Sequence, residues 1–456
     1  MKPNLGAVNQ LNFRVLRLCR CCLVSGVRYD PIDSTLFIHN REKLNELLKP
    51  NSIVVIHAND IMPTNADGTL LLQQNRDLFY FSGVDQEETV LILFPDAKTE
   101  RDRMILFVRE TNEHVAVWEG AKLDKEQATA VSGIERVEWT SAFESTLMTL
   151  VPQAEHIYLA TNEHIRAMRT VETRNDRFIK ECKERFPLHH FERLAPLTNQ
   201  LRIIKEPVEV EMLQKACDIT EAGFRRVLSF LKPGVGEWEV EAEYLHEFVR
   251  SRSRGFAYSP IIGSGKNACV LHYLENDQIC QDGDLLLMDV AAEYANWNAD
   301  MTRTVPVNGK YTPRQRAVYN SVLSVLRQAD EILRPGITPQ DYHHQVREFM
   351  EKELIELGLL DAKEASEQDR KKLPLVSKYY MHGTSHHLGL DVHDVGPFNE
   401  PVREGMVFTI EPGIYIPEEN LGVRLENDFL IGKDSNVDLM ANIPIEADEI
   451  EALMNA

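Results

Sequence analysis

The second half of the chain contains the same order of features twice, and this duplication restricts the fold more than any other feature of the sequence. In the first copy, the apolar run LLLM leads to Asp289, and Asp300 follows 11 residues later before another strand-like run. In the second copy, FTI leads to Glu411, and Glu426 follows 15 residues later. Each copy predicts a strand ending on a carboxylate, a turn, a second carboxylate and a returning strand.

Helical patterns repeat around these acidic hairpins. The segments SFLKPGVGEWEVEAEYLHEFVRS (229–251) and EILRPGITPQDYHHQVREFMEKE (331–353) each combine a helix end, a basic-Pro-Gly turn and an amphipathic helix, at an offset of 102 residues. Thr312 to Gln315 predict a capping box at the start of the helix that leads into the second copy. We expect two half-domains that face each other across a pseudo-twofold axis and bring the four acids together.

Four carboxylates around one cavity need compensating charge, because like charges a few ångströms apart raise each other's pKa. Two divalent cations would supply that charge. Carboxylate oxygens with one imidazole suit Mn²⁺, with Zn²⁺, Co²⁺ or Fe²⁺ as other occupants. The imidazole is expected from the glycine-containing segment 381–396, but spacing does not choose the ligand among its histidines. These are His382, His386, His387 and His393.

The first half of the chain has a different pattern. Short β-branched runs at 52–58, 89–95, 103–109 and 156–161 alternate with helical segments, which predicts an α/β domain with a mixed or parallel sheet. No glycine-rich nucleotide-binding motif occurs there. Residues 185–207 look like the passage to a second domain, and a helix is predicted from Pro207 to Pro233-Gly234. A length of 456 residues also favours more than one domain.

Composition restricts partners and compartment. The net charge of −21 argues against a nucleic-acid partner, and no run reaches the ~20 apolar residues of a membrane span. The seven cysteines are odd in number and lack the spacing of a disulfide scaffold, so we expect reduced thiols and a cytoplasmic protein. Residues 1–27 form a basic extension, interpreted as a disordered segment, a transit peptide or an upstream translation artefact.

Several motifs resemble those of the Xaa-Pro aminopeptidases, or aminopeptidase P, within the pita-bread metallopeptidases. They are IIGSGKNACVLHY, the Asp pair with DMTRT, HGTSHHLGLDVHD, TIEPGIYI and VRLEND. The segment QQNRDLFYFSGVDQEETVLIL is similar to the creatinase-type domain of that family. The resemblance implies an α+β protein. An N-terminal creatinase-type α/β domain would cover residues 28–195, and a pita-bread catalytic domain with an internal repeat would cover residues 196–456.

The resemblance also implies an activity and a set of site residues. The activity is hydrolysis of the N-terminal Xaa-Pro bond of peptides by a hydroxide between two metal ions, with Mn²⁺ as the expected metal. Asp300 and Glu426 would bridge the ions, Asp289 would hold one of them, and His386 with Glu411 would complete the other. Glu411 is also the expected proton shuttle. The relatives imply a homo-oligomer, either a dimer or a tetramer.

Other residues match positions that line the substrate site of that family. His272 and His393 are expected to stabilise the oxyanion or to orient the scissile carbonyl. His382 and Arg424 are the expected substrate-binding residues. Structural alternatives stay open for some of them: Arg424 would neutralise the acids, and His382 and His387 would be packed histidines. The segment from Arg76 to Gly83 is interpreted as core and domain-interface packing.

Two functional alternatives remain at this point. A prolidase would cleave only Xaa-Pro dipeptides, and pocket closure, which separates it from an aminopeptidase, is not visible in the sequence. A pita-bread module without catalysis would bind peptides or proteins, but such modules typically lose ligands and all five are present here. Creatinase-like chemistry is disfavoured for the same reason. The native metal, the preferred first residue and the oligomeric state are not determined by the sequence.

Overall fold

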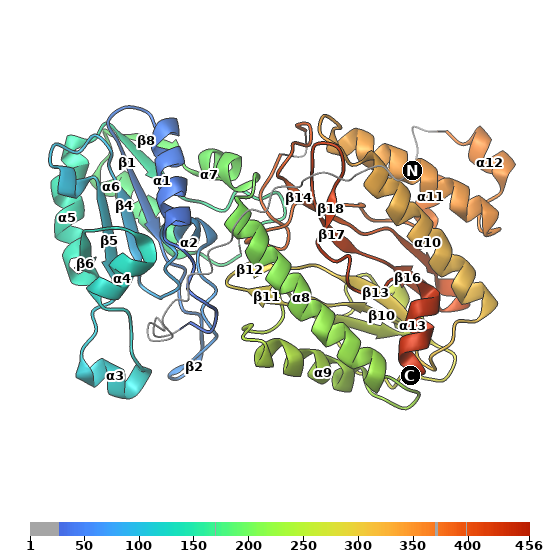
Figure 1. Ribbon diagram of the computed structural model, residues 1–456. Coiled ribbons are helices and arrows are strands. Elements are labelled where there is room, and N and C mark those ends of the chain that lie inside the picture. The colour runs from blue at the N-terminus through green and yellow to red at the C-terminus, as the bar shows by residue number, and fades with distance from the viewer. Residues whose placement is uncertain (1–26, 169, 370–372, 398) are drawn as a thin grey trace, which may run out of the picture.

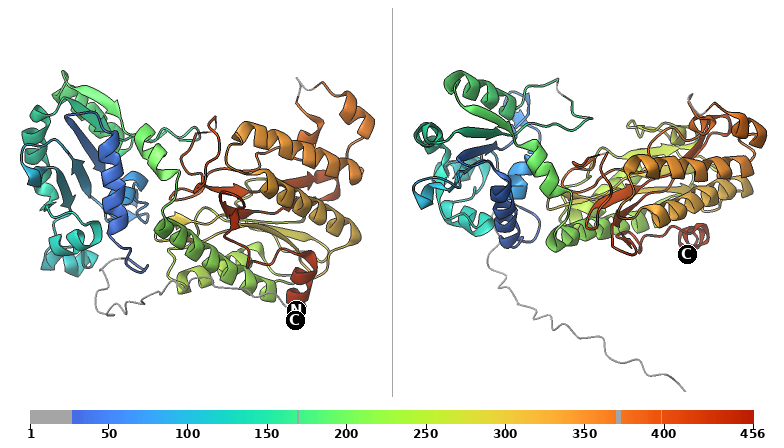
Figure 2. Two further views of the ribbon diagram at one scale, coloured as in Figure 1. Left: turned by 45° about the horizontal axis from the view of Figure 1, so that its top comes forward. Right: turned by 90° about the horizontal axis from the view of Figure 1, so that it is seen from above.

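The computed structural model of the protein describes residues 27–456, apart from residue 169, residues 370–372 and residue 398. The prediction for the basic N-terminal extension therefore lies outside the described residues, except for Val27. An N-terminal α/β unit and a C-terminal unit of helices packed on strands lie side by side (Figures 1 and 2). Among the described helices, none has a stretch both long and apolar enough to cross a lipid bilayer.

A six-stranded mixed sheet forms the centre of the N-terminal unit. Its central strand β1 (Ser52–His57) runs antiparallel to β4 (Val90–Leu93) and parallel to β7 (His156–Leu159). The order is β6-β5-β4-β1-β7-β8, with β5 at Met104–Val108, β6 at Val137–Trp139 and β8 at His190–Arg193. The sequence predicted a mixed or a parallel sheet, and the observed sheet is mixed.

Alternating side chains of the sheet face two helical layers. Ile53 and Val55 of β1 pack in a core with α5 (Phe143–Leu150) and α6 (Arg174–Arg185). Val54 and Ile56 point the other way, toward α1 (Thr35–Leu47), α2 (Arg76–Ser82) and α4 (Lys125–Ser132). This alternation follows from the two-residue period of a strand. The result is a three-layer unit with helices on both faces of the sheet.

The remaining N-terminal elements are small. The hairpin of β2 (Pro63–Asn65) and β3 (Gly68–Thr69) and the helix α3 (Glu113–Glu119) extend from one end of the unit, and α3 contains no buried residue (Figure 1). The passage to the C-terminal unit contains β8 and the helix α7 (Ala195–Arg202). The predicted domain boundary between residues 195 and 196 stays a prediction, and it falls at the first residue of α7.

Helices cover one face of the C-terminal unit. Four long helices lie in front of the strands in Figure 1, and they are α8 (Pro207–Phe230), α9 (Glu237–Arg250), α10 (Pro313–Ile332) and α11 (Pro339–Glu356). The short helices α12 (Ala362–Glu367) and α13 (Ala447–Met454) complete the set. Thr312 caps α10, and Thr312 and Gln315 form the predicted capping box. The helix predicted from Pro207 ends at Phe230, three residues before Pro233.

The main strands of the C-terminal unit form two three-stranded sheets, one for each sequence copy. The first has the order β13-β10-β9, with β9 at Ile261–Ser264, β10 at Leu285–Asp289 and β13 at Thr302–Pro306. The second has the order β14-β17-β18, with β14 at Val407–Ile410, β17 at Asn427–Leu430 and β18 at Val437–Asp438. The prediction of an α+β chain with an internally repeated C-terminal unit is confirmed.

Candidate metal centre

The two copies place their acids at equivalent points of two antiparallel strand pairs. β10 ends at Asp289, which pairs with Thr302, and Asp300 lies just before the returning strand β13. Glu411 follows β14, and Glu426 comes directly before β17. Between the acids of each pair lies a small hairpin: β11 (Glu293–Tyr294) with β12 (Trp297–Asn298), or β15 (Gly413–Ile416) with β16 (Leu421–Arg424). In the chain, each hairpin thus has one carboxylate of its pair before it and the other after it.

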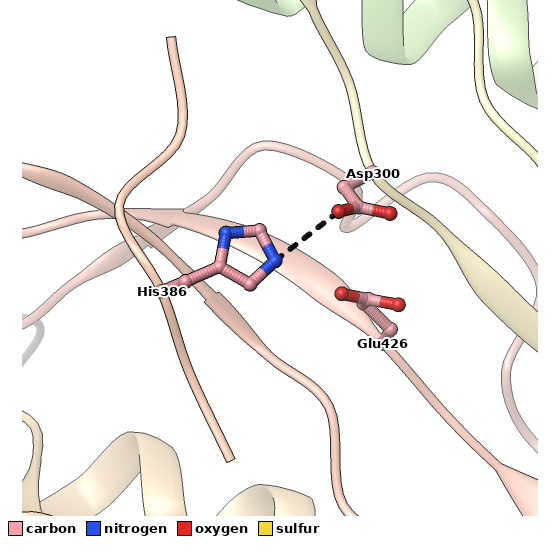
Figure 3. A group of neighbouring side chains, drawn as sticks. All are labelled: Asp300, His386 and Glu426. Carbon is pink, nitrogen blue, oxygen red and sulfur yellow. Dashed lines mark ion pairs between the residues drawn. The ribbon is translucent and has the colours of Figure 1, made fainter. Parts of the chain in front are cut away.

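Three of the predicted ligands form a compact buried cluster. Ligand atoms of Asp300, His386 and Glu426 all lie within 4.8 Å of one another, and their side chains point toward a common centre (Figure 3). His386 Nε2 is 3.3 Å from Asp300 Oδ2 and 3.7 Å from Glu411 Oε1. The structure therefore brings four of the five predicted ligands together. They are the imidazole of His386 and, beside it, the carboxylates of Asp300, Glu411 and Glu426.

The backbone fixes which nitrogen of His386 faces the acids. Nδ1 lies 2.9 Å from the carbonyl oxygen of His387, which leaves Nε2 for the cluster. The amide of Thr409 in β14 donates to the carbonyl of His386 at 3.0 Å, and the amide of Glu411 donates to Thr384 at 2.8 Å. These bonds hold the histidine segment beside the strand that leads to Glu411. A bond on the far nitrogen is typical of a metal-binding histidine.

The fifth predicted ligand, Asp289, is paired with Arg424. Arg424 Nη2 lies 2.6 Å from Asp289 Oδ2, while Asp289 Oδ1 has no hydrogen-bond partner among the described residues. Arg424 also donates to the hydroxyl groups of Tyr415 at 2.9 Å and Thr302 at 3.0 Å. The Thr302 hydroxyl in turn donates to Glu426 at 2.7 Å. Arg424 therefore neutralises the cluster, as one of the two interpretations from sequence stated.

The electrostatics of the cluster show an excess of negative charge. Burial, with the nearby Asp300 and Glu411, raises the pKa of Glu426 well above its usual range. Burial raises the pKa of Glu411 to about 7, although the charge of His386 opposes the shift. Burial alone would lower the pKa of His386, but the hydrogen bond to Asp300 and the charge of Glu411 raise it to about 9. Added positive charge would favour the ionised carboxylates.

These observations fit a divalent metal. The donors are carboxylate oxygens and one imidazole nitrogen, a set that suits hard or borderline cations. The unpartnered Oδ1 of Asp289 and the raised pKa of Glu426 both indicate that the carboxylates have too few positive partners within the described protein.

The predicted substrate-binding residues lie at different distances from the cluster. The ring of His393 is 4.4 Å from that of His386 and contacts Arg166, whose Nη1 is 2.9 Å from His393 Nε2. His382 contacts the hydroxyl of Tyr415 at 2.8 Å. His272 is exposed and has no hydrogen bond to a described residue.

His387 occupies a different environment from its neighbour. Its side chain is buried, its ring lies 4.2 Å from that of Phe408, and burial lowers its pKa to about 3. Of the alternatives left open by the sequence, this geometry favours a packed histidine. Phe79 likewise packs against Trp297 at 5.6 Å across the two units, in keeping with interface packing of the segment around Arg76.

Some site residues were not found from the sequence. Tyr415 and Thr302 lie inside the quoted motifs TIEPGIYI and DMTRT, and their place on strands beside the acids was the signal that could have found them. Arg166 belongs to the N-terminal unit and carries no motif, so its contact with His393 depends on the tertiary structure. Asp428 accepts a hydrogen bond from the amide of Asp300 at 3.0 Å and thereby supports one of the predicted ligands.

Comparisons with known proteins give consistent results. The model of metallopeptidase family M24 matches residues 211–433, and that of the aminopeptidase P N-terminal domain matches residues 37–158. The chain is 34% identical to an Xaa-Pro aminopeptidase of Escherichia coli K12, over 92% of this chain and 97% of the relative. Human Xaa-Pro aminopeptidase 3 is 28% identical over 88% of this chain and 80% of its own length.

Solved structures agree with these relatives. A putative aminopeptidase P from Bacillus anthracis matches with a TM-score of 0.86 and 33% identity, over 93% of this chain and 99% of that one. Zinc-substituted aminopeptidase P from Escherichia coli, in complex with product, matches with a TM-score of 0.83 and 32% identity over the same shares.

Proposed function

The chain belongs to metallopeptidase family M24 and is a metal-dependent aminopeptidase, and from this premise we propose that it removes the first residue of peptides whose second residue is proline. The single observation that carries the proposal is the buried group of Asp300, His386 and Glu426 beside Glu411. The names of the relatives support the specificity for proline. The prolidase and binding-module alternatives are not favoured.

We assign five residues to two divalent ions, with Mn²⁺ as the proposed metal. Asp300 and Glu426 would contact both ions, Asp289 would hold one, and His386 with Glu411 would complete the other. When bound, such ions lower the pKa of water and polarise a carbonyl oxygen. The compact cluster and the free Oδ1 of Asp289 support this assignment.

Glu411 is the proposed proton carrier. Its carboxylate would take a proton from the attacking water, and its acid form would give that proton to the proline nitrogen. Its side chain is only partly buried, and the amide that holds it donates to Thr384. Glu411 is therefore held by the backbone while its carboxyl group remains accessible to substrate.

Four further residues have proposed roles toward the substrate. His393, beside His386, would orient the scissile carbonyl or stabilise the oxyanion, and His272 would assist from the exposed side. His382 and Arg424 would bind the substrate on the side of Tyr415, which contacts both of them. Neutral His382 can donate only one ring hydrogen, because burial lowers its pKa to about 4.

A Mn²⁺-dependent assay tests the function. We expect release of the first residue from an Xaa-Pro-Xaa tripeptide, abolished by chelation and restored by Mn²⁺. Glu411→Gln should lower kcat at least about a hundredfold, because general acid–base catalysis contributes roughly 10²–10⁴ in rate. An Xaa-Pro dipeptide is assayed beside the tripeptide. Cleavage of the dipeptide alone would support a prolidase, and absence of bound or activating metal would support a binding module.

We further propose a homo-oligomer, a dimer or a tetramer, located in the cytoplasm. Val117 and Trp118 of α3 are 80% and 77% exposed, and large exposed apolar groups that gather together mark association surfaces. The described cysteines Cys182, Cys217, Cys269 and Cys280 are unpaired, which supports a reducing compartment. Light scattering of the purified protein and fractionation of cells would test these two proposals.

A further inference from the structure

A cavity of about 410 Å³ lies in the N-terminal unit, at the carboxyl end of β1 and beside the first residues of α5 and α6. Its volume is within the range of small-molecule sites. It adjoins the sheet face that packs on α5 and α6, whereas α1 and α2 cover the opposite face (Figure 1). β1 has a parallel neighbour on one side and an antiparallel neighbour on the other. Ligands of open α/β sheets bind in the crevice outside the carboxyl ends of the strands.

His57 is a buried polar residue of this cavity without a partner. It continues the alternation of Ile53 and Val55 on β1, so an apolar side chain would suit the packing there. His57 is only 3% exposed, and its Nε2 has no hydrogen-bond partner among the described residues. The ring meets Phe143 and Phe178 edge-on, at 5.3 and 4.4 Å. Burial lowers its pKa to about 3, so the imidazole is neutral and can hydrogen-bond a ligand.

The cavity also contains an arginine without a counter-ion. Arg174 is the first residue of α6, is half-buried, and makes no ion pair with any residue that the structure describes. The acids nearby are already neutralised. Asp60 pairs with Arg177 at 2.6 Å, and Glu87 pairs with Lys122 at 2.5 Å. The amino end of a helix adds positive potential at Arg174. The guanidinium lies over the ring of Phe178, 5.6 Å from the ring centroid, so it has an aromatic contact but no carboxylate partner among the described residues, which favours an anionic group on a ligand.

Glu88 provides an acid in the lining. Its backbone has φ 55°, in the left-handed region that a non-glycine residue rarely adopts. Such strain often occurs at residues that clamp ligands. Its nearest cation, Arg109, is 3.7 Å away through Nε, while Nη1 of Arg109 binds Glu87 and Glu119. The exposed carboxylate of Glu88 is therefore only loosely paired.

We propose that this cavity binds a free α-amino acid with an apolar side chain. The carboxylate of the amino acid would pair with Arg174, and its ammonium group would pair with Glu88. The side chain of the amino acid would pack against Phe143 and Val90. A multiply charged anion such as a phosphate ester fits less well, because three carboxylates lie in the lining. The lining residues that carry this argument are His57, Glu88, Val90, Phe143 and Arg174.

Calorimetric titration of the full chain with L-leucine or L-phenylalanine tests the proposal. We expect saturable binding that Arg174→Gln and Glu88→Gln each weaken at least about tenfold, the loss of one charge-assisted contact. The carboxamide of leucine lacks the carboxylate and should lose affinity as Arg174→Gln does. N-acetyl-leucine lacks the ammonium group and should lose it as Glu88→Gln does.

Lys180→Gln is the matched control, because it removes an exposed cation of α6 that does not line the cavity. It should bind leucine as the unchanged protein does. An amino acid bound at the metal centre would instead respond to Asp300→Asn and not to Arg174→Gln, and that result would overturn the proposal. Absence of any saturable binding would overturn it as well.

Discussion

Arg424 neutralises Asp289 without occupying the whole carboxylate. The ion pair uses Oδ2 at 2.6 Å, and Oδ1 remains without a hydrogen bond among the described residues. Two hydroxyl groups, those of Tyr415 and Thr302, hold the guanidinium in place. Asp289 can therefore keep its arginine and still offer an oxygen to a cation. Arg424 thereby orients a proposed ligand in addition to balancing its charge.

The buried His57 should make the stability of the N-terminal unit dependent on pH. Burial lowers its pKa to about 3 in the folded chain, against about 6.5 when unfolded. Below pH 6.5 the unfolded chain takes up a proton that the folded chain does not, so stability falls as pH falls toward 3. Between pH 7 and pH 5 this group should cost about 2 kcal/mol.

Hydrogen-exchange protection of the β1 amides, measured at pH 7 and pH 5, checks the effect of His57. His57→Leu removes the titrating group. In this variant the protection of the β1 amides should therefore change less between pH 7 and pH 5, and the difference should equal the cost assigned to His57. The difference between the two proteins isolates His57 from all other titrating groups. Equal pH dependence in both would contradict a neutral, buried His57.

Single residues also show where sequence reasoning reached its limit. The positions of the four acids beside strands could be predicted, because each acid follows or precedes a strand in a repeated pattern. The choice of His386 could not come from spacing, because four histidines share one irregular glycine-containing segment. It depends on the bond between its Nδ1 and the carbonyl of His387, which no periodicity encodes.

At the scale of elements, the capping box of α10 ties one sequence motif to one structural effect. The amide of Gln315 donates to the Thr312 hydroxyl at 3.2 Å, and the amide of Thr312 donates to the Gln315 side chain at 2.9 Å. Thr312→Ala should lower the free energy of unfolding by about 1 kcal/mol, and Thr312→Ser should restore most of it. Urea denaturation measures both variants. A loss of stability with serine equal to that with alanine would show that the cap is not the cause.

Elements with a strong apolar signal were predicted, and elements without one were missed. The runs that became β1, β4, β5 and β7 are mostly buried and consist largely of aliphatic and aromatic residues. The strand β8 reads HFER, lies at the sheet edge, and has exposed residues at both ends with two half-buried residues between them. Such a strand is held by its backbone pairing with β7 rather than by an apolar pattern, so its sequence resembles a linker.

At the scale of the whole molecule, a buried ionic network joins the two units. Arg202, at the end of α7, donates to Asp77 of the N-terminal unit at 3.0 Å. The same guanidinium contacts Asp391 at 2.7 Å and Asp394 at 2.6 Å, in the segment that contains His393. Lys205 also binds Asp394, at 3.0 Å. The position of His393 beside the cluster therefore depends on contacts between parts of the chain that the sequence pattern does not connect.

Removal of the Arg202 guanidinium should weaken the junction and loosen the segment with His393. Arg202→Met keeps much of the buried side-chain volume but leaves Asp77 without its cation, so the free energy of unfolding should fall by about 3–5 kcal/mol. Arg193→Met is the matched control, because its guanidinium pairs with Glu163 at the surface and is 71% exposed, and surface pairs contribute about 0–1 kcal/mol. Chemical denaturation gives the two stabilities, and hydrogen exchange of residues 391–394 reports the local loosening. Similar losses in both variants, or unchanged exchange in this segment, would show that Arg202 does not join the units in solution.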